Sequence, residues 1–369
     1  MTTYRLLGLM SGSSLDGLDL ALCHFHLDNE SVVKWEIEQA ATLPYTERWS
    51  KKLRTAASLD GKDLVDLDYS YGALLGQLCI RFLKKNKIKI SDVTAVASHG
   101  HTLFHEPKKG FTFQLGHGAA IAAQTGLTTI CDFRASDVAL GGQGAPLAPL
   151  VDRLFYPEFR LFLNIGGIAN ISAVLPDKIV AFDVTGANQV LDALAAQAGK
   201  AFDKDGKLAA SADGFDSGLS TAFGKLSFYT APFPKSLSNQ WVQKNMVEPA
   251  LASPAPVPAK LQAVCHHIGY EVARAIGQIK TATGADFSGQ RLFITGGGAF
   301  NKYLVETIKQ YTGQTHGVEV HVPEKNIVNF KEALLMALMG AYRLEGIPNC
   351  IASVTGASKD AIGGTVFLP

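Results

Sequence analysis

Apolar runs joined by glycine-rich turns dominate the first part of the chain. Leu6–Met10 is continuously apolar, like a buried strand, and residues 18–23 then alternate leucine with smaller or polar side chains. The residues between them have little side-chain bulk, and Gly12 can adopt positive φ. The pattern therefore predicts a strand, a tight turn and a second strand. Backbone N–H groups in such a turn can converge on a phosphate, although the same residues also suit an ordinary hairpin turn.

The same pattern returns later in the chain. Residues 161–172 form two apolar runs joined by a Gly-Gly turn, and residues 291–298 form a strand that ends in glycines. Between these segments, residues 179–183 predict a strand that ends at Asp183, followed by a small-residue loop and a helix over 190–198. Open α/β sheets place catalytic groups at such strand ends. Asp183 would equally suit the simpler role of capping the helix.

Longer helices are predicted where apolar residues recur at a spacing of three and four. The clearest is 63–85, and a second long helix is predicted over 261–283. Together with the short strands they predict an α/β chain. Its 369 residues, 47% of them hydrophobic, are enough for two domains.

Charge and cysteine content narrow the function classes. Lys and Arg number 34 against 33 Asp and Glu, a formal charge of +1, which argues against nucleic acid or an anionic membrane as a partner. The five cysteines form no Cys-x-x-Cys pair, which is typical of a reducing, cytoplasmic compartment. The first apolar run is too short for a signal peptide, and no run reaches about 18 apolar residues. We therefore expect a soluble, unprocessed protein.

Histidines gather at the end of a predicted strand over 93–98, in His99-Gly-His-Thr-Leu-Phe-His105. Neither this spacing nor Cys265-His266-His267 matches a zinc motif, although a metal-dependent hydrolase stays a distant alternative. His99 or His101 is better suited to hydrogen-bond a polar substrate. A glycine-rich loop over 141–147 would admit a ligand close to the backbone, or would serve only as a flexible connector. No Walker A motif or complete G-x-G-x-x-G fingerprint is present.

A set of longer motifs resembles one family. They are Gly8-Leu-Met-Ser-Gly-Ser-Ser-Leu-Asp-Gly-Leu-Asp19, Ser98-His-Gly-His-Thr102, Asp132-Phe-Arg134, Gly141-Gly-Gln-Gly-Ala-Pro-Leu147, Asn164-Ile-Gly-Gly-Ile-Ala-Asn170, Gly296-Gly-Gly-Ala-Phe-Asn301 and Val354-Thr-Gly-Ala357. In this order, from Leu6 to near Thr365, they resemble the anhydro-N-acetylmuramic acid kinases. That family belongs to the actin-like, hexokinase-like ATP-binding superfamily.

The resemblance implies two α/β lobes of the ribonuclease H type, with an ATP and sugar cleft between them. We expect residues 1–128 plus 347–369 to form the first lobe and residues 129–346 the second. The implied activity uses ATP and Mg²⁺ to open 1,6-anhydro-N-acetylmuramic acid and to phosphorylate it to N-acetylmuramic acid 6-phosphate, in peptidoglycan recycling. The resemblance also suggests a homodimer.

The resemblance also assigns roles to residues of this chain. Asp183 would be the catalytic base, and Asp16 or Asp19 would hold magnesium. The ATP-binding residues would be Gly12, Ser13, Ser14, Leu15, Asp16, Gly17, Leu18, Asp19, Gly166, Gly167, Asn188, Gly296, Gly297 and Gly298. The sugar-binding residues would be His99, Arg134, Gln143 and Glu332. Without the resemblance, Glu332 would be a surface carboxylate at a helix start, and Arg134 would brace the junction between the domains.

Two departures from the family pattern keep alternatives open. The family commonly reads Phe-Asp-Thr-Gly-Pro-Gly-Asn where this chain has Phe182-Asp-Val-Thr-Gly-Ala-Asn188, and His101 stands where Gln is usual. A kinase for another anhydrosugar, such as levoglucosan, is therefore one alternative. A sensor that binds nucleotide and sugar without turnover is another.

Overall fold

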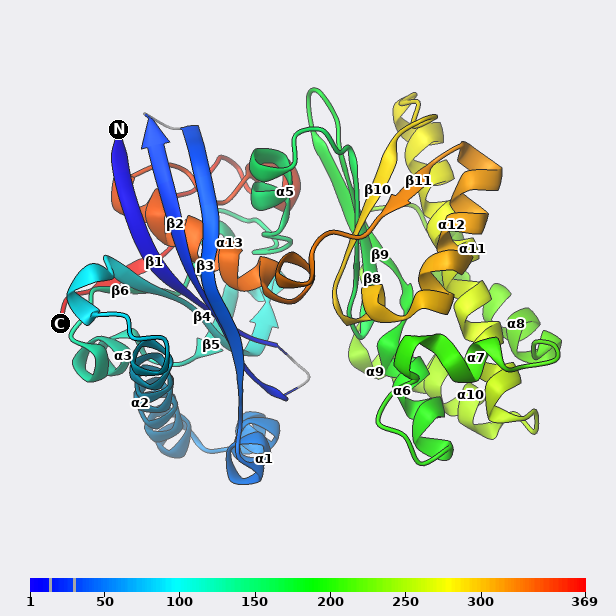
Figure 1. The fold of residues 1–369 in the computed structure, drawn as a ribbon, viewed down its shortest axis with the longest axis horizontal. Coiled ribbons are helices and arrows are strands. Elements are labelled where there is room, and N and C mark those ends of the chain that lie inside the picture. Colours follow the sequence, from blue (N-terminus) through cyan, green and yellow to red (C-terminus); the bar gives the residue numbers. More distant parts are fainter. Residues whose placement is uncertain (13–14, 29–30) are drawn as a thin grey trace. The chain divides into compact units, whose positions relative to one another are not determined.

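The chain folds into two compact units in a computed structural model that describes residues 1–12, 15–28 and 31–369 (Figure 1). The first unit comprises Met1–Phe155 and Phe330–Pro369, and the second comprises Tyr156–Asn329. This division differs from the expected one, which separated the lobes after residues 128 and 346. The reason is sheet pairing and helix packing: strand β6 (Thr129–Cys131) and most of helix α13 (Lys325–Glu345) are built into the first unit.

The sheet of the first unit has the strand order β12-β6-β4-β1-β2-β3, with β5 paired to β4. Strands β1, β2 and β3 form an antiparallel meander, which confirms the predicted opening hairpin, and β4 runs parallel to β1. The strand bounds are β1 (Thr2–Ser11), β2 (Gly17–Asp28), β3 (Ser31–Pro44), β4 (Ala95–Glu106), β5 (Phe111–Leu115) and β12 (Thr365–Phe367).

Both faces of strand β1 are covered, which explains its continuous apolar run. Leu7 and Leu9 belong to a core shared with α2 (Gly61–Lys85) and α3 (Gly118–Thr125). On the other face, a Cβ at Gly8 would lie 1.9 Å from the Ala333 carbonyl oxygen, so α13 approaches β1 as closely as glycine allows. The unit also contains α1 (Glu47–Thr55), α4 (Ala135–Ala139), α5 (Pro149–Phe155) and α14 (Ala352–Thr355).

The second unit repeats the same arrangement. Its sheet has the order β11-β10-β7-β8-β9, with β7, β8 and β9 antiparallel and β10 and β11 parallel to β7. The strand bounds are β7 (Leu161–Ile165), β8 (Ile168–Val174), β9 (Ile179–Gly186), β10 (Arg291–Thr295) and β11 (Glu319–His321). The mixed α/β class expected from the sequence is confirmed.

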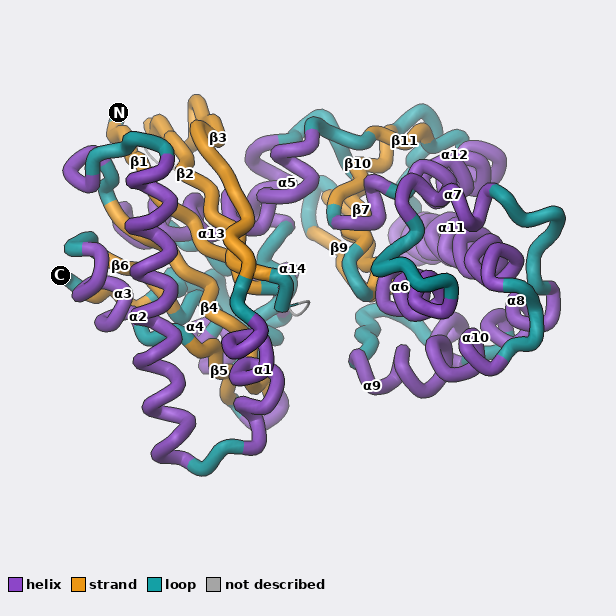
Figure 2. The backbone as a smooth tube through the Cα atoms, turned by 60° about the horizontal axis from the view of Figure 1, so that its bottom comes forward, coloured by secondary structure: helices purple, strands orange, loops and turns teal. Residues whose placement is uncertain are grey.

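Helices α6 (Asn188–Gln197), α11 (Val257–Thr283) and α12 (Lys302–His316) share the core of this unit with one face of the sheet (Figure 2). Successive side chains of a strand point to opposite faces. Leu292 and Ile294 accordingly join that core, while Phe293 packs with Phe159 and Phe162. Shorter helices complete the unit: α7 (Lys207–Ala210), α8 (Ser217–Gly224), α9 (Asn239–Val242) and α10 (Glu248–Ala252).

Two predicted strand ends are wrong. Strand β4 does not stop at Ser98 but continues through the histidine motif to Glu106, and β9 does not stop at Asp183 but continues to Gly186. Both strands change pairing register at these points, with Gly100 at φ +73° in β4 and Val184 left out of the pairing in β9. Such bulges interrupt the alternation of side chains and re-aim those beside them.

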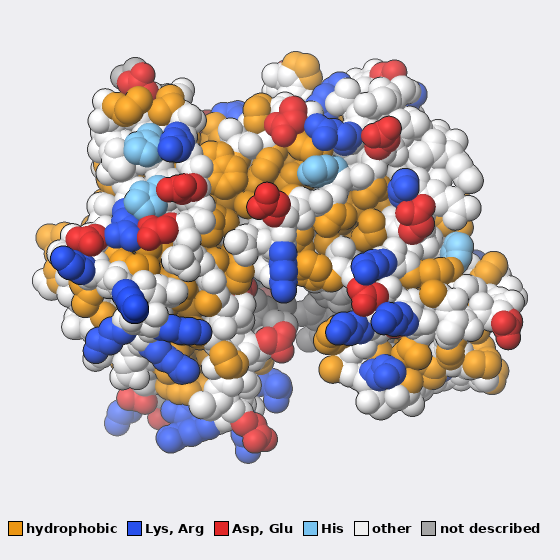
Figure 3. All heavy atoms as spheres, in the orientation of Figure 1, with side chains coloured by type: hydrophobic (Ala, Val, Ile, Leu, Met, Phe, Trp, Pro, Cys, Tyr) orange, Lys and Arg blue, Asp and Glu red, His pale blue; other side chains and the backbone are white. Residues whose placement is uncertain are grey.

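Charge is mixed over the surface. On the face shown in Figure 3, basic side chains gather over the part of the first unit that carries α2 and α1, and acidic side chains are interspersed elsewhere. No helix within the described ranges is long and apolar enough to span a bilayer.

Candidate active site

The turn between β1 and β2 is held by backbone contacts on both sides of its tip. Ser13 and Ser14 lie outside the described residues. Leu15 has φ 60° and donates its N–H to the Gly12 carbonyl at 3.4 Å. The Tyr45 N–H donates to the Asp16 carbonyl at 3.3 Å. A left-handed leucine is a strained conformation that its surroundings must impose.

Side chains fix the start of this turn through Ser11. The Tyr45 hydroxyl donates to Ser11 Oγ at 3.0 Å and contacts the Tyr71 hydroxyl at 2.7 Å. His101 Nδ1 lies 3.3 Å from Ser11 Oγ, and burial lowers the pKa of His101. His101 is therefore neutral at pH 7, and the structure pairs it with the turn.

Asp19 of β2 lies among other carboxylates. Its Oδ1 accepts a hydrogen bond from the Thr42 hydroxyl. Burial raises its pKa to about 6, against the Thr42 hydrogen bond, and the charges of Glu332 and Asp16 raise it further. Carboxylate oxygens near one another suit a hard cation such as Mg²⁺. Within the described ranges no three His, Cys, Asp or Glu side chains enclose a metal position, so Mg²⁺ here would keep water or phosphate ligands, as is usual for it.

His99 and Arg134 form a fixed pair in the first unit. Arg134 Nε donates to His99 Nε2 at 2.9 Å, and His99 Nδ1 donates to the Gly100 carbonyl at 3.0 Å. Burial, the positive charge of Arg134 and neighbouring histidines lower the pKa of His99 to about 3. His99 is therefore a neutral imidazole protonated on Nδ1, and it orients the guanidinium. Arg134 also donates to the Gly144 carbonyl.

The glycine-rich loop is anchored by a buried carboxylate that sequence reasoning missed. Asp137 accepts the Gly144 N–H at 2.7 Å and the Thr355 hydroxyl at 2.6 Å. The Gln143 N–H donates to the Thr355 carbonyl at 2.8 Å, while the Gln143 side chain is exposed. The loop is therefore held in place, which argues against a flexible connector. The Thr355 motif contributed to the family resemblance, but nothing in the sequence pairs it with Asp137.

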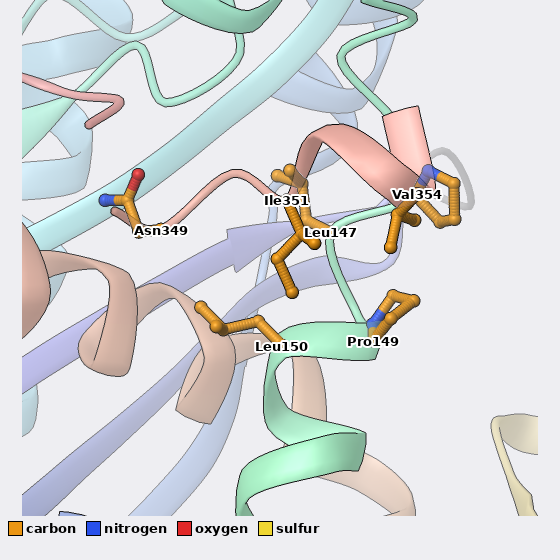
Figure 4. A pocket seen from close by; sticks show the side chains of 7 residues that line it. Leu147, Pro149, Leu150, Asn349, Ile351 and Val354 are labelled. Atoms are coloured by element: carbon orange, nitrogen blue, oxygen red, sulfur yellow. The ribbon is translucent and has the colours of Figure 1, made fainter. Parts of the chain in front are cut away.

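Beyond its glycines, the loop and the start of α5 pack against residues 349–354 (Figure 4). Leu147, Leu150 and Ile351 line a void of about 10 Å³ between the two segments, together with Pro146, Pro149, Asn349 and Val354. A space of this size holds about one water molecule. It is a packing defect beneath the loop and is too small for a sugar.

We expect Asp137→Ala to destabilise the protein by about 2 kcal/mol, because it leaves the Gly144 N–H and the Thr355 hydroxyl buried without their acceptor. Thermal unfolding measures the loss. Asp66→Ala, on the exposed face of α2, is the control and should stay within about 0.5 kcal/mol of the parent. A melting temperature for Asp137→Ala equal to that of the control would show that Asp137 does not hold the loop.

Glu332 lies in the interior of α13, so the expectation of a carboxylate at a helix start is wrong. Its side chain is exposed, and its negative charge acts on both Asp19 and Arg134. Four sequence-predicted residues of the first unit, Asp16, Asp19, Arg134 and Glu332, therefore share one electrostatic neighbourhood.

In the second unit the predicted nucleotide residues also come together. The Asn188 N–H donates to the Gly166 carbonyl at 3.0 Å, and Asn188 Nδ2 donates to the Ile165 carbonyl at 3.1 Å. Gly296 has φ +82°, and a Cβ there would lie 2.6 Å from the Ile165 carbonyl oxygen. A Cβ at Gly298 would clash with Ile165, whereas Gly297 has room for one. The fold itself requires glycine at 296 and 298.

The Gly166–Gly167 turn differs from these positions. A Cβ at Gly166 or Gly167 would make only ordinary contacts, at 3.6 and 3.8 Å, and neither residue has positive φ. The fold therefore has room for alanine at both positions. Neither backbone conformation nor packing requires glycine in this turn. The absence of side chains leaves its backbone N–H groups accessible to a ligand.

Asp183 follows Phe182 at the bulge of β9. Its N–H donates to the Lys235 carbonyl at 3.0 Å, and its Oδ2 accepts the Leu237 N–H at 2.8 Å. Burial raises the pKa of Asp183, and the Leu237 hydrogen bond lowers it in part. The side chain is half-buried and caps no helix, because α6 starts after Ala187. A half-buried carboxylate with a raised pKa has the properties of a general base.

Nearly the whole chain is similar to proteins of one family. Residues 4–369 match the family model described as anhydro-N-acetylmuramic acid kinase. The proteins of that name from Mannheimia succiniciproducens and Shewanella sediminis are 32% and 34% identical, covering 98% and 100% of this chain and 98% and 99% of their own. Among solved structures, component A of (R)-2-hydroxyglutaryl-CoA dehydratase from Acidaminococcus fermentans aligns with a TM-score of 0.45 and 12% identity, over 93% of this chain and 99% of that one. On the sequence match, the chain belongs to the anhydro-N-acetylmuramic acid kinase family.

Proposed function

We propose that the protein is an ATP-dependent kinase that opens 1,6-anhydro-N-acetylmuramic acid with water and phosphorylates it to N-acetylmuramic acid 6-phosphate, in cell-wall recycling. The observation that carries this proposal is the family match across residues 4–369, at full coverage of the curated relatives. The geometry supports this proposal. The residues that the resemblance assigns to the sugar lie in the first unit, where Arg134 contacts His99, and in the second unit Asn188 contacts the glycine turn that the resemblance assigns to ATP.

Asp183 is the proposed base. It takes a proton from the water that attacks the anomeric carbon, the bond from that carbon to the bridging oxygen breaks, and the freed 6-oxygen attacks the γ-phosphorus as ADP leaves. Burial raises the pKa of Asp183, which favours uptake of a proton by its carboxylate. Positioning and charge stabilisation provide most of the rate in phosphoryl transfer.

The nucleotide and magnesium are assigned to the two glycine-rich turns. Residues 12–19 and the Gly166–Gly167 turn would hold the phosphates, and Gly296, Gly297 and Gly298 would lie along the adenosine, with Asn188 fixing the second turn. Asp16 and Asp19 would hold Mg²⁺. Its positive charge would offset the negative charge of the phosphates and would also reduce the repulsion between these two carboxylates.

The sugar is assigned to His99, Arg134, Gln143 and Glu332. Arg134 is pre-oriented by His99 and by the Gly144 carbonyl, so little conformational entropy is lost when it binds an acceptor. Gln143 and Glu332 have exposed side chains that are free to meet hydroxyl and amide groups of a sugar.

We further propose a cytoplasmic homodimer, as the family resemblance implies. All five cysteines are free, as a reducing compartment requires. Light scattering of the purified protein tests the dimer.

The direct test is an ADP-release assay with ATP, Mg²⁺ and either 1,6-anhydro-N-acetylmuramic acid or levoglucosan, with mass spectrometry of the product. We expect turnover of the muramic compound to a 6-phosphate that has gained one water. Turnover of levoglucosan alone would overturn the substrate assignment. Binding of ATP without turnover of either sugar would indicate a sensor.

The phosphate role of the second turn has its own test. We expect Gly167→Ala to raise the KM for ATP about tenfold without lowering the melting temperature, because the new methyl group meets only Gln189 Cβ, at 3.8 Å, within the protein. Steady-state kinetics and thermal unfolding measure the two effects.

Two further glycines serve as controls for this test. Gly224→Ala lies in open space without positive φ and should change neither quantity. Gly296→Ala should unfold at lower temperature, because its φ and the Ile165 carbonyl both require glycine. An unchanged KM in Gly167→Ala would remove this turn from the nucleotide site.

A further inference from the structure

The segment 228–237 of the second unit has no role in the proposed function, yet it contacts Asp183 directly. Two hydrogen bonds of Asp183 go to it, one to the Lys235 carbonyl and one from the Leu237 N–H. The ring of Phe233 also stacks on Phe182, with centroids 4.9 Å apart and planes at 3°. The orientation of the Asp183 carboxylate therefore depends on where this segment lies.

Lys235 fastens the segment to itself and to helix α11. Its ammonium group donates to the carbonyls of Phe228 and Tyr229 at 3.3 and 3.4 Å and to Gln278 Oε1 at 3.4 Å. It also lies 4.9 Å from the ring centroid of Phe228. Gln278 Nε2 in turn donates to the Tyr229 carbonyl at 3.2 Å. One cation and one amide thus close the segment into a loop anchored on α11.

A second anchor holds the strand on the other side of Asp183. Thr185, next to the bulge, contacts the buried Tyr229 hydroxyl at 2.7 Å, and that hydroxyl lies 2.8 Å from His267 Nε2 on α11. The bulge at Val184 is therefore fixed through Tyr229, the residue whose carbonyl binds Lys235 and Gln278. Strand, segment and helix meet around Asp183.

We infer that Lys235 and Gln278 are positioning residues, which hold the segment 228–237 so that the Leu237 amide orients the Asp183 carboxylate for proton transfer. This inference rests on the proposed role of Asp183 as base. Neither residue is assigned to ATP or to sugar. Loss of the tether should therefore affect the chemical step and leave substrate binding unchanged.

The test is the kinetics of Lys235→Met over a range of pH. We expect kcat to fall about tenfold with the KM for ATP and for sugar unchanged. The acid limb of the kcat profile should move to higher pH, because the Leu237 hydrogen bond lowers the pKa of Asp183 and a loosened segment weakens it. Lys235→Arg, which keeps the cationic donor, should restore both quantities in large part.

Matched variants separate positioning from stability. Lys244→Met, an exposed lysine of the same unit, should behave as the parent. Gln278→Leu should change kcat and the acid limb in the same direction as Lys235→Met but less, and the double variant should fall short of the product of the two effects. If Lys235→Met does not fold, Gln278→Leu carries the test alone.

Further titratable and charged groups around the tether are Arg274, Glu271, His267 and the Tyr229 hydroxyl, whose pKa burial raises beyond the working range. Burial and the charge of Arg274 keep the pKa of His267 at about 3, outside the working range, and burial raises that of Glu271 to about 7. If the acid limb of the kcat profile reports the titration of Asp183, this limb must persist in the variant Glu271→Gln.

The outcomes distinguish this inference from the function on which it rests. A lower yield or melting temperature of Lys235→Met with kcat and acid limb unchanged would overturn the inference, provided that Asp183→Asn is inactive. Full turnover by Asp183→Asn would instead overturn the role of Asp183, whatever Lys235→Met does.

Discussion

Replacing Asp183 by Asn should lower kcat at least about a hundredfold, equivalent to about 2.7 kcal/mol of transition-state stabilisation, and leave the fold intact. The amide cannot take the proton from the attacking water. It can still accept the Leu237 N–H through its oxygen, so the hydrogen bond that fixes the side chain survives. Steady-state kinetics and thermal unfolding, compared with the exposed Asp177→Asn, separate the two effects.

The pH dependence of the parent gives the same assignment a second check. Burial holds the pKa of Asp183 above the ordinary aspartate value. The base acts when it is deprotonated, so kcat should fall as the pH drops through this raised pKa, and the limb should be absent from the residual activity of Asp183→Asn. Near-normal turnover in the variant would remove Asp183 from the role of base.

Much of the fold could be predicted because several strands have a clear pattern of apolar residues. The continuous run at Leu6–Met10 indicates a strand buried on both faces, and the structure places it between α2 and α13. The hairpins at 161–172 and at the amino terminus are visible in the same way, since apolar strands flank bare turns. These features depend only on neighbouring residues.

Both mistaken strand ends have one physical cause. The alternation of side chains breaks at the bulges beside Gly100 and Val184, and the sequence pattern therefore predicts that each strand ends there. The strands continue, and the bulges lie next to His99 and Asp183. The candidate site residues His99 and Asp183 therefore lie where the periodic pattern is interrupted, as expected for functional sites that depart from regular structure.

Partners distant in sequence could not be predicted. Asp137 and Thr355 are 218 positions apart, and neither stands in a pattern that implies the other. Lys235 is one lysine among many until the fold brings its ammonium group to Gln278 and to two carbonyl oxygens. The motifs therefore predict which residues belong to the candidate site, and only the structure shows which contacts hold those residues.

A buried ion pair in the first unit should give the largest effect on stability. Lys331 Nζ lies 2.8 Å from Asp152 Oδ1, and the two side chains are only 7% and 2% exposed. Lys331→Met removes the cation and leaves a buried carboxylate without its counter-charge. We expect a loss of about 3–5 kcal/mol, which thermal unfolding and urea unfolding would measure.

The pH dependence of that loss follows from Asp152. Burial raises its pKa, and the charge and hydrogen bond of Lys331 lower it in part. Without Lys331 the folded-state pKa rises further while the unfolded value stays the same. Asp152 then destabilises the folded state increasingly as pH rises from the ordinary aspartate pKa toward the raised one. The difference from the parent should therefore be greater at pH 8 than at pH 5.

The double variant Asp152→Leu/Lys331→Met decides between two explanations of the loss. If the uncompensated charge is the cause, replacing both partners by apolar side chains should recover most of the stability, because neither charge then has to be buried. If the double variant is as unstable as Lys331→Met at both pH values, the lysine stabilises α13 through packing along its methylene chain, and the ion pair contributes little.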